Sequence, residues 1–255
     1  YLLLRVVVAA EPTAAHLLAP LAAALAALTV VYAALAALRA IDLRQASGYL
    51  SMIPGGVTVL GLAALSPLAI GGAILSLFSG GLAAALIVGV CATLADRAQS
   101  RSLSVLSGLA ARMPNLTWLM ILGGFGVLGV PLLATYLSGV MTFFGSFKTQ
   151  PVGAFAVAAG LALAAVALAS LYRRVLFGAP NPDAPGVSDS SLGETWFLGL
   201  LAGALLWVGI FPSGPKLPGT DTPLFDPGLI NVLGAGVSEI ASPYTLPNPS
   251  PSPAP

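Results

Sequence analysis

The chain has 255 residues, of which 57% are hydrophobic and 7% are charged. Soluble domains are usually about a quarter charged, so this composition excludes an ordinary soluble domain and indicates an integral membrane protein. Ten basic residues nearly balance nine acidic ones, which leaves a formal net charge of +1 and gives no sign of a nucleic-acid partner.

The chain opens on a short apolar segment, YLLLRVVVAAEP, which Glu11 and Pro12 bring to an end. A spanning helix needs about 20 apolar residues, so we interpret residues 1–12 as the end of a transmembrane helix whose beginning lies upstream. The segment lacks the basic start and the small-residue cleavage site of a signal peptide. We therefore interpret Tyr1 as a cut or split point.

Apolar stretches over residues 13–211 predict about six complete membrane crossings in one transmembrane domain. Charged residues close the first stretch, and Ser66-Pro67 divides a long charge-free interval into the second and third. The predicted crossings lie at residues 17–38, 46–65, 68–94, 113–147, 152–171 and, for the shorter last one, 196–211. The predicted fold class is an all-α membrane protein.

The fourth stretch, residues 113–147, carries the sequence GVPLLATYLSGV in its middle. Gly129 and Pro131 disfavour a continuous helix, so we predict two half-helices joined at these residues. Discontinuous helices at membrane depth are tolerated where protein or a hydrated cavity satisfies the freed backbone groups, and they often line an ion path. A simple kink is the alternative.

The distribution of basic residues predicts the topology. If residues 113–147 cross once, seven arginines fall on one side of the membrane and satisfy the positive-inside rule. They are Arg39, Arg44, Arg97, Arg101, Arg112, Arg173 and Arg174, whereas Lys148 and Lys216 fall on the other side.

The last predicted crossing is followed by a segment of different composition. Ser190 or Ser191 is predicted to cap this crossing, with Glu194 in its first turn. Residues 212–255 are rich in Pro, Ser and Gly, and we expect them to form a tail on the side opposite the arginines. Beyond Tyr244 we expect disorder, and an extended conformation bound to a partner is the alternative.

Several short motifs, in order and nearly in spacing, resemble the second half of the antiporter-like chain M of respiratory complex I, the proton-pumping NADH:quinone oxidoreductase. The resemblance covers residues 1–211 and implies two inverted five-helix repeats, each with a broken helix; the region around Gly129 would be the second break. The motifs are Asp42-Leu43-Arg44 with Tyr49 and Ser51, Gly108-Leu109-Ala110 with Met113-Pro114, Gly129-Val130-Pro131, Gly145-Ser146-Phe147, and Leu171-Tyr172-Arg173-Arg174-Val175-Leu176-Phe177-Gly178.

The resemblance also places the family's titratable proton-path residues on this chain. Two histidines fall on Pro54 and Gly80, and the acidic residue of the second broken helix falls on Gly139. A lysine would lie upstream of Tyr1, and Arg44 replaces a lysine at a helix end. Because nearby hydroxyls titrate far outside the working range, we expect a degenerate proton path. Hydroxyls that could still hold water are those of Ser51, Ser76, Ser79, Thr135, Tyr136 and Ser138.

Other chemistry has little support. Cys91 is the one cysteine, which excludes an intrachain disulfide, and its apolar surroundings are typical of a core residue. His16 is expected at the membrane interface rather than in a relay, and neither a metal-ligand spacing nor a nucleophile-base pair is evident. We expect a non-catalytic subunit without cofactors of its own, with flavin and iron-sulfur clusters in partner subunits.

The expected partners are other membrane subunits of a complex I-like assembly and lipids. Two alternatives stay open: a degenerate, truncated duplicate of chain M that acts as a scaffold, and a subunit of a related cation/proton antiporter or membrane-bound hydrogenase. The Ala-, Leu- and Arg-rich composition favours a bacterial cytoplasmic membrane, with the mitochondrial inner membrane as the alternative.

Overall fold

The computed structural model describes residues 12–103, 106–178 and 189–210, which form seven α-helices and one 3₁₀ turn without any strand. The predicted all-α class is thereby confirmed. Of the helix end predicted over residues 1–12, residues 1–11 lie outside the described residues, and so does the whole predicted tail, residues 212–255. The helices are α1 (Pro12–Leu38), α2 (Leu43–Ala63), α3 (Pro67–Arg97), α4 (Pro114–Leu128), α5 (Ala134–Phe147), α6 (Pro151–Val175) and α7 (Leu192–Ile210), and the 3₁₀ turn is Leu109–Ala111.

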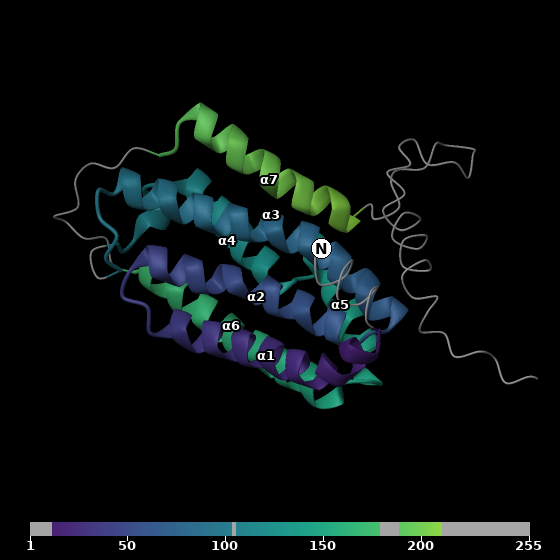
Figure 1. Cartoon of the computed structure of the whole chain (residues 1–255). Coiled ribbons are helices and arrows are strands. Elements are labelled where there is room, and N and C mark those ends of the chain that lie inside the picture. Colours follow the sequence, from purple (N-terminus) through teal and green to yellow (C-terminus); the bar gives the residue numbers. More distant parts are fainter. Residues whose placement is uncertain (1–11, 104–105, 179–188, 211–255) are drawn as a thin grey trace, which may run out of the picture.

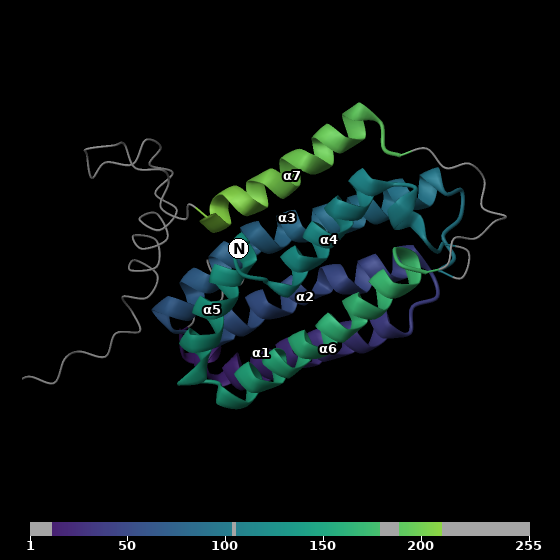
Figure 2. The same cartoon turned by 180° about the vertical axis from the view of Figure 1, so that it is seen from behind.

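The helices lie in two layers. Helices α7, α3, α2 and α1 follow one another across one face (Figure 1), and α4, α5 and α6 cover the opposite face (Figure 2). Each of the longest helices packs along its neighbours: α1 against α2 and α6, and α3 against α2 and α5. The buried surface between the layers is built mostly from Ala, Leu and Val, as expected where helices pack closely within a membrane.

Five helices are long and apolar enough to cross a membrane, namely α1, α2, α3, α6 and α7. Helices α4 and α5 have only 15 and 14 residues. At 1.5 Å per residue neither reaches across a hydrocarbon core of about 30 Å. The pair together therefore makes the sixth crossing, as the sequence predicted for residues 113–147.

Local signals explain several helix starts. Helices α3, α4 and α6 each begin with a proline, which lacks the N–H group that the first turn leaves unbonded in any case. Ser66 accepts a hydrogen bond from the Ala69 amide at 3.2 Å and donates one to the Gly145 carbonyl at 2.8 Å. The predicted division at Ser66-Pro67 is confirmed, and the same serine ties the start of α3 to the end of α5.

The basic residues of the described helices and loops separate between the two ends of the bundle as predicted, while Lys216 lies outside the described residues. All seven arginines lie at or beyond the ends of α1, α3 and α6 or at the starts of α2 and α4, which meet at one end, and Lys148 follows α5 at the other. At the arginine end, the Ser191 amide donates to the Glu194 carboxylate at 2.8 Å, and the Ser191 hydroxyl accepts from the Glu194 amide at 3.4 Å. Ser191 is thus the residue that caps α7.

Glycines bring α3 and α5 close together. A Cβ atom at Gly72 would lie 2.7 Å from the Thr142 amide, and one at Gly145 would clash with the backbone of Ala69. Small residues at such crossings let helix backbones approach in a membrane. This contact holds one face of α5 against the interior of the bundle, where its hydroxyl groups become important.

Candidate functional site

The break between α4 and α5 is a defined backbone structure. Gly129 has φ +70° and closes α4, and the amides of Gly129 and Val130 both bond to the Phe125 carbonyl, the latter at 3.1 Å. Leu132 has φ +81°, which non-glycine residues rarely adopt, and its side chain is exposed. Together with the exposed Pro131, these residues form the link between two half-helices, so the predicted joint at Gly129 and Pro131 is confirmed.

Helix α7 covers the link from one side. A Cβ atom at Gly209 would clash with the backbone of Leu132 and Ala134, so the end of α7 lies directly against the irregular segment. Irregular backbone at membrane depth is tolerated only where protein or a hydrated cavity surrounds it. Here α7 provides the protein on one side, and a cavity lies on the other.

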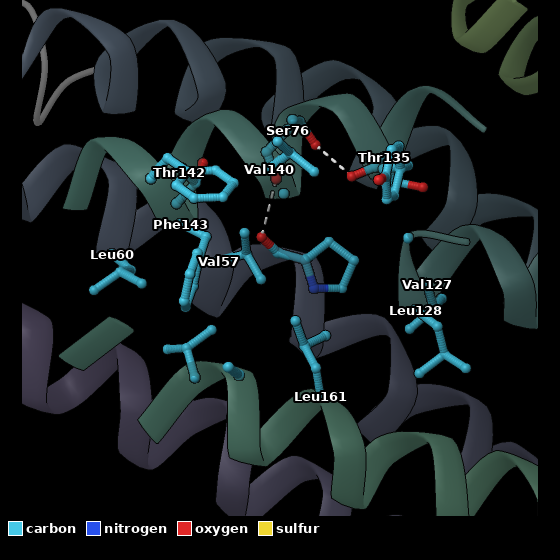
Figure 3. A pocket seen from close by; sticks show the side chains of 18 residues that line it. Val57, Leu60, Ser76, Val127, Leu128, Thr135, Val140, Thr142, Phe143 and Leu161 are labelled. Carbon is cyan, nitrogen blue, oxygen red and sulfur yellow. Dashed lines mark hydrogen bonds between the residues drawn. The ribbon is translucent and has the colours of Figure 1, made fainter. Parts of the chain in front are cut away.

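The cavity has a volume of about 240 Å³ and lies between α2, α3, α6 and the two half-helices. Figure 3 shows Val57, Leu60, Val127, Leu128 and Leu161 around it, with hydroxyl side chains on the α3 and α5 walls. The lining residues are Pro54, Val57, Leu60, Ser76, Val127, Leu128, Gly129, Thr135, Tyr136, Ser138, Gly139, Val140, Thr142, Phe143, Phe144, Val157, Ala158 and Leu161. The set contains no Asp, Glu, Lys, Arg or His.

One polar cluster joins α2 to α3 beside the cavity. The Thr58 hydroxyl lies 2.9 Å from the Pro54 carbonyl and 3.0 Å from the Ser76 hydroxyl, and the Ser76 hydroxyl lies 3.4 Å from the same carbonyl. All three groups are buried. Each polar atom in this cluster therefore has a partner within the protein, and Ser76 and Pro54 border the cavity whereas Thr58 does not.

Helix α5 differs, because three of the four hydroxyl groups along one of its faces are buried without a hydrogen-bond partner among the described residues. Thr135, Ser138, Thr142 and Ser146 are spaced three and four residues apart and so share one face of α5. Ser138 donates to the Thr135 carbonyl at 2.9 Å. The hydroxyl oxygens of Thr135, Thr142 and Ser146 have no hydrogen-bond partner among the described residues, although at most 7% of each residue is exposed. Thr135 and Thr142 border the cavity, so their hydroxyl groups favour hydrogen-bonding molecules inside it, whereas Ser146 does not border it.

Pro54 and Gly80 lie in contact with each other. A Cβ atom at Gly80 would lie 2.5 Å from the Pro54 Cβ, so the proline ring fills the space that a side chain at position 80 would need. Pro54 borders the cavity, whereas Gly80 is buried behind it and does not. The structure thus joins two of the three predicted positions, but it places only one of these two at the cavity.

Gly139 is the open position of the three. It borders the cavity, and a Cβ atom built on it would meet no atom within 4 Å. The α5 wall consequently has room for a side chain at the position where the resemblance places an acidic residue. Gly80 and Gly139, where the resemblance places titratable residues, therefore differ in the space that surrounds them.

The lining residues offer hydrogen-bonding groups and include no carboxylate, imidazole or amine side chain. Hydroxyl and carbonyl groups hold water well, and a cavity of this size far exceeds the roughly 15 Å³ that one water requires. The described residues contain no group of three or more His, Cys, Asp or Glu side chains that could hold a metal ion. The site can therefore bind water or small neutral molecules.

Sequence reasoning identified part of this lining. Ser76, Thr135, Tyr136 and Ser138 do border the cavity, but Ser51 and Ser79 instead bond to the carbonyls of Gly48 and Leu75 within their own helices. Thr142, which also borders the cavity, was missed. Its spacing from Thr135 and Ser138 was the available signal, since it places all three on one helical face.

Comparisons with known proteins agree with this architecture. Residues 1–165 match the family model described as "NADH:quinone oxidoreductase/Mrp antiporter, TM". The F(420)H(2) dehydrogenase subunit M of Methanosarcina mazei is 31% identical over 74% of this chain and 38% of its own length. The NADH-quinone oxidoreductase subunit M of Rickettsia prowazekii is 26% identical over 84% of this chain and 44% of its own length.

A solved structure shares the fold. A chain of respiratory complex I from Thermus thermophilus matches with a TM-score of 0.82 and 22% identity, over 94% of this chain and 48% of that chain. The chain thus spans less than half the length of the curated relatives that it matches. The arrangement of helices described here therefore resembles about half of that chain.

Proposed function

Since the chain belongs to the NADH:quinone oxidoreductase/Mrp antiporter transmembrane family, we propose that it is a chain M-like subunit in the membrane arm of a complex I-like assembly. Within that arm, the half of the antiporter-like fold described here serves as a structural element rather than as a relay of titratable groups. The multi-pass helical architecture and the subunit M relatives support the first part of the proposal. The composition of the cavity supports the second.

The single observation that carries the second part is the cavity at the helix break. Its walls hold hydroxyl, carbonyl and apolar groups but no carboxylate, imidazole or amine. A proton relay needs groups that change protonation near the working pH, and hydroxyls do not. A free charge in such surroundings would also be strongly disfavoured, because nothing charged lies opposite it.

The proposal assigns the redox chemistry to partner subunits. Flavin and iron-sulfur clusters would reside there, and this chain would contribute helices, interfaces and lipid contacts. Its one cysteine, Cys91, is buried in α3 and is 2% exposed, so it offers no set of thiolate ligands for a cluster. The chain is accordingly proposed to be non-catalytic.

The chain is a multi-pass membrane protein, and we propose the bacterial cytoplasmic membrane as its location. The arginine end of the bundle would face the cytoplasm, as the positive-inside rule requires. Lys148 would then face the periplasm. A mitochondrial inner membrane with the arginine end in the matrix is the alternative.

The second candidate function is a scaffold outside the NADH-linked assembly. The matching family model covers Mrp antiporter subunits as well as NADH:quinone oxidoreductase subunits, so a cation/proton antiporter could be the host complex, as could a membrane-bound hydrogenase. The loss of titratable side chains at Pro54, Gly80 and Gly139 is equally compatible with a degenerate paralogue of chain M. These possibilities differ in the subunits that surround the chain.

The proposal is tested by purifying the tagged full chain in a mild detergent and identifying the associated proteins by mass spectrometry. We expect flavin- and iron-sulfur-binding subunits of a complex I-like enzyme to co-purify. A second, intact chain M in the same complex would identify this chain as a scaffold paralogue. Recovery of antiporter subunits without redox subunits would overturn the complex I assignment.

A further inference from the structure

The turn between α1 and α2 gathers exposed arginines at one end of the bundle. Arg39 directly follows α1, and Arg44 lies in the first turn of α2. The Leu43 amide donates to the Arg101 carbonyl at 2.9 Å, and the Leu103 amide donates to the Ile41 carbonyl at 3.0 Å, so Arg101 lies beside the same turn. We call Arg39, Arg44 and Arg101 the turn arginines.

The turn arginines are not neutralised within the described part of the chain. All three are exposed, and none forms an ion pair with a described residue, whereas Arg97 on α3 pairs with Glu194 at 2.6 Å. Asp42 is the one acidic residue among residues 39–44 and 101–103. Three positive charges against one negative charge leave an excess that suits an anionic group.

An exposed apolar stripe on α1 leads directly to this charge. Leu28, Tyr32 and Leu35 are 64%, 56% and 48% exposed, and Arg39 follows at the next position of the same helical face. From Leu28 to Arg39 the helix rises by about 16 Å, which is close to half of a hydrocarbon core of about 30 Å. An acyl chain in one leaflet has this length.

Helix α2 supplies the other wall of this surface. Tyr49 packs edge-on against Tyr32, with ring centroids 6.2 Å apart, and Met52 is 42% exposed. Gly48 is exposed one turn before Met52 on the same face of α2, and a Cβ atom there would meet no atom within 4 Å. The surface below the turn arginines is thus apolar, with a shallow open position at Gly48.

We propose that the turn arginines and the apolar surface below them bind an anionic phospholipid. Its phosphate would lie against the guanidinium groups of Arg39, Arg44 and Arg101, which suit a phosphate because they present several N–H donors in a plane. One acyl chain would lie along Tyr32, Leu35 and Gly48. A free phosphate would use the arginines alone, so the apolar stripe points to a lipid.

The first test is native mass spectrometry of the purified full chain with phosphatidylglycerol and phosphatidylcholine in competition. Arg39→Gln/Arg44→Gln is expected to lower the preference for phosphatidylglycerol by roughly 25-fold, about fivefold for each arginine. Arg173→Gln/Arg174→Gln is the matched control, because it removes two exposed arginines from the same side of the membrane. An equal loss in the control would show a general effect of positive charge and would overturn the proposed site.

The second test separates a lipid from a free phosphate. Gly48→Leu keeps all arginines and adds a side chain to the apolar surface where the acyl chain would lie. A Cβ atom at this position meets no atom within 4 Å, so we expect the variant to fold. We expect weaker retention of phosphatidylglycerol, and no displacement of the lipid by an excess of inorganic phosphate. Unchanged retention in Gly48→Leu, or displacement by inorganic phosphate, would contradict binding of a whole phospholipid.

Discussion

Gly80 on α3 and Gly139 on α5 correspond to titratable residues in the resemblance to chain M, but their surroundings differ. A Cβ atom at Gly80 would collide with Pro54, whereas one at Gly139 would extend into the open cavity. At position 80 the neighbouring helix occupies the space that a side chain would need. At position 139 that space is open to the cavity beside the helix break.

Gly80→Ala is expected to have the largest effect on stability, because Pro54 already occupies the space that the new methyl group would need. The new methyl group would lie under 3.0 Å from Pro54, and overpacking of this kind destabilises by about 1–3 kcal/mol. The measurement is thermal unfolding of the purified chain, followed by tryptophan fluorescence. Gly81→Ala is the control, since the next residue of α3 is exposed and has no atom within 4 Å of its Cβ position.

The same measurement on Pro54→Ala and Pro54→Ala/Gly80→Ala would locate the cause. If the proline ring is the obstacle, the effect of Gly80→Ala becomes smaller once the ring is removed, and the two substitutions are non-additive. An equal effect in both backgrounds, or a Gly80→Ala protein as stable as Gly81→Ala, would rule out the contact as the reason for glycine at this position.

Gly129→Ala tests the backbone at the helix break, which borders the open cavity. Its φ of +70° places a Cβ atom close to the Thr135 carbonyl, at 3.2 Å, and the left-handed conformation disfavours an L-residue by about 1–2 kcal/mol. We expect a loss of stability of that size. Leu132→Gly is the counterpart, because it relieves a positive φ at an exposed position and is expected to be neutral or stabilising.

The comparison also shows which features the sequence could reveal. The break was predictable because Gly129 and Pro131 are chemically unsuited to a continuous helix, and the division at Ser66-Pro67 followed from the same kind of local signal. The location of all seven arginines at one end of the bundle was predictable from the positions of charged residues relative to the apolar stretches. These features depend on neighbours in sequence, so a single sequence contains them.

Contacts between distant segments were not predictable in the same way. The contact of Pro54 with Gly80 joins α2 to α3, and no local sequence pattern predicts it. Likewise, Thr142 is important because α3 holds that face of α5 inward at Gly72, and the covering of the break by Gly209 depends on the path of α7. Such features arise from packing geometry, which composition and periodicity do not specify.

Gly139→Ala tests the open side with a smaller expected effect. No atom lies within 4 Å of the added methyl group, and alanine is favoured over glycine inside a helix by about 0.5–1 kcal/mol. We therefore expect a stabilisation of up to about 1 kcal/mol in the same unfolding measurement. A destabilised protein would show that the cavity does not extend to this position.

Gly139→Glu is expected to restore a side chain without restoring transport. The cavity has space for it, but no described lining residue carries a positive charge, so the carboxyl group would stay neutral in largely apolar surroundings. Pro54 and Gly80 would still interrupt any path on the α2 and α3 side.

The measurement is proton movement, followed with a pH-sensitive dye, in vesicles that contain the assembled chain, with Gly139→Gln as the uncharged control of the same size. We expect equal rates for the native protein and both variants. Faster proton movement in Gly139→Glu alone would mean that one carboxyl group suffices to complete a relay through the hydroxyls of α5, and it would contradict a purely structural role for this half of the fold.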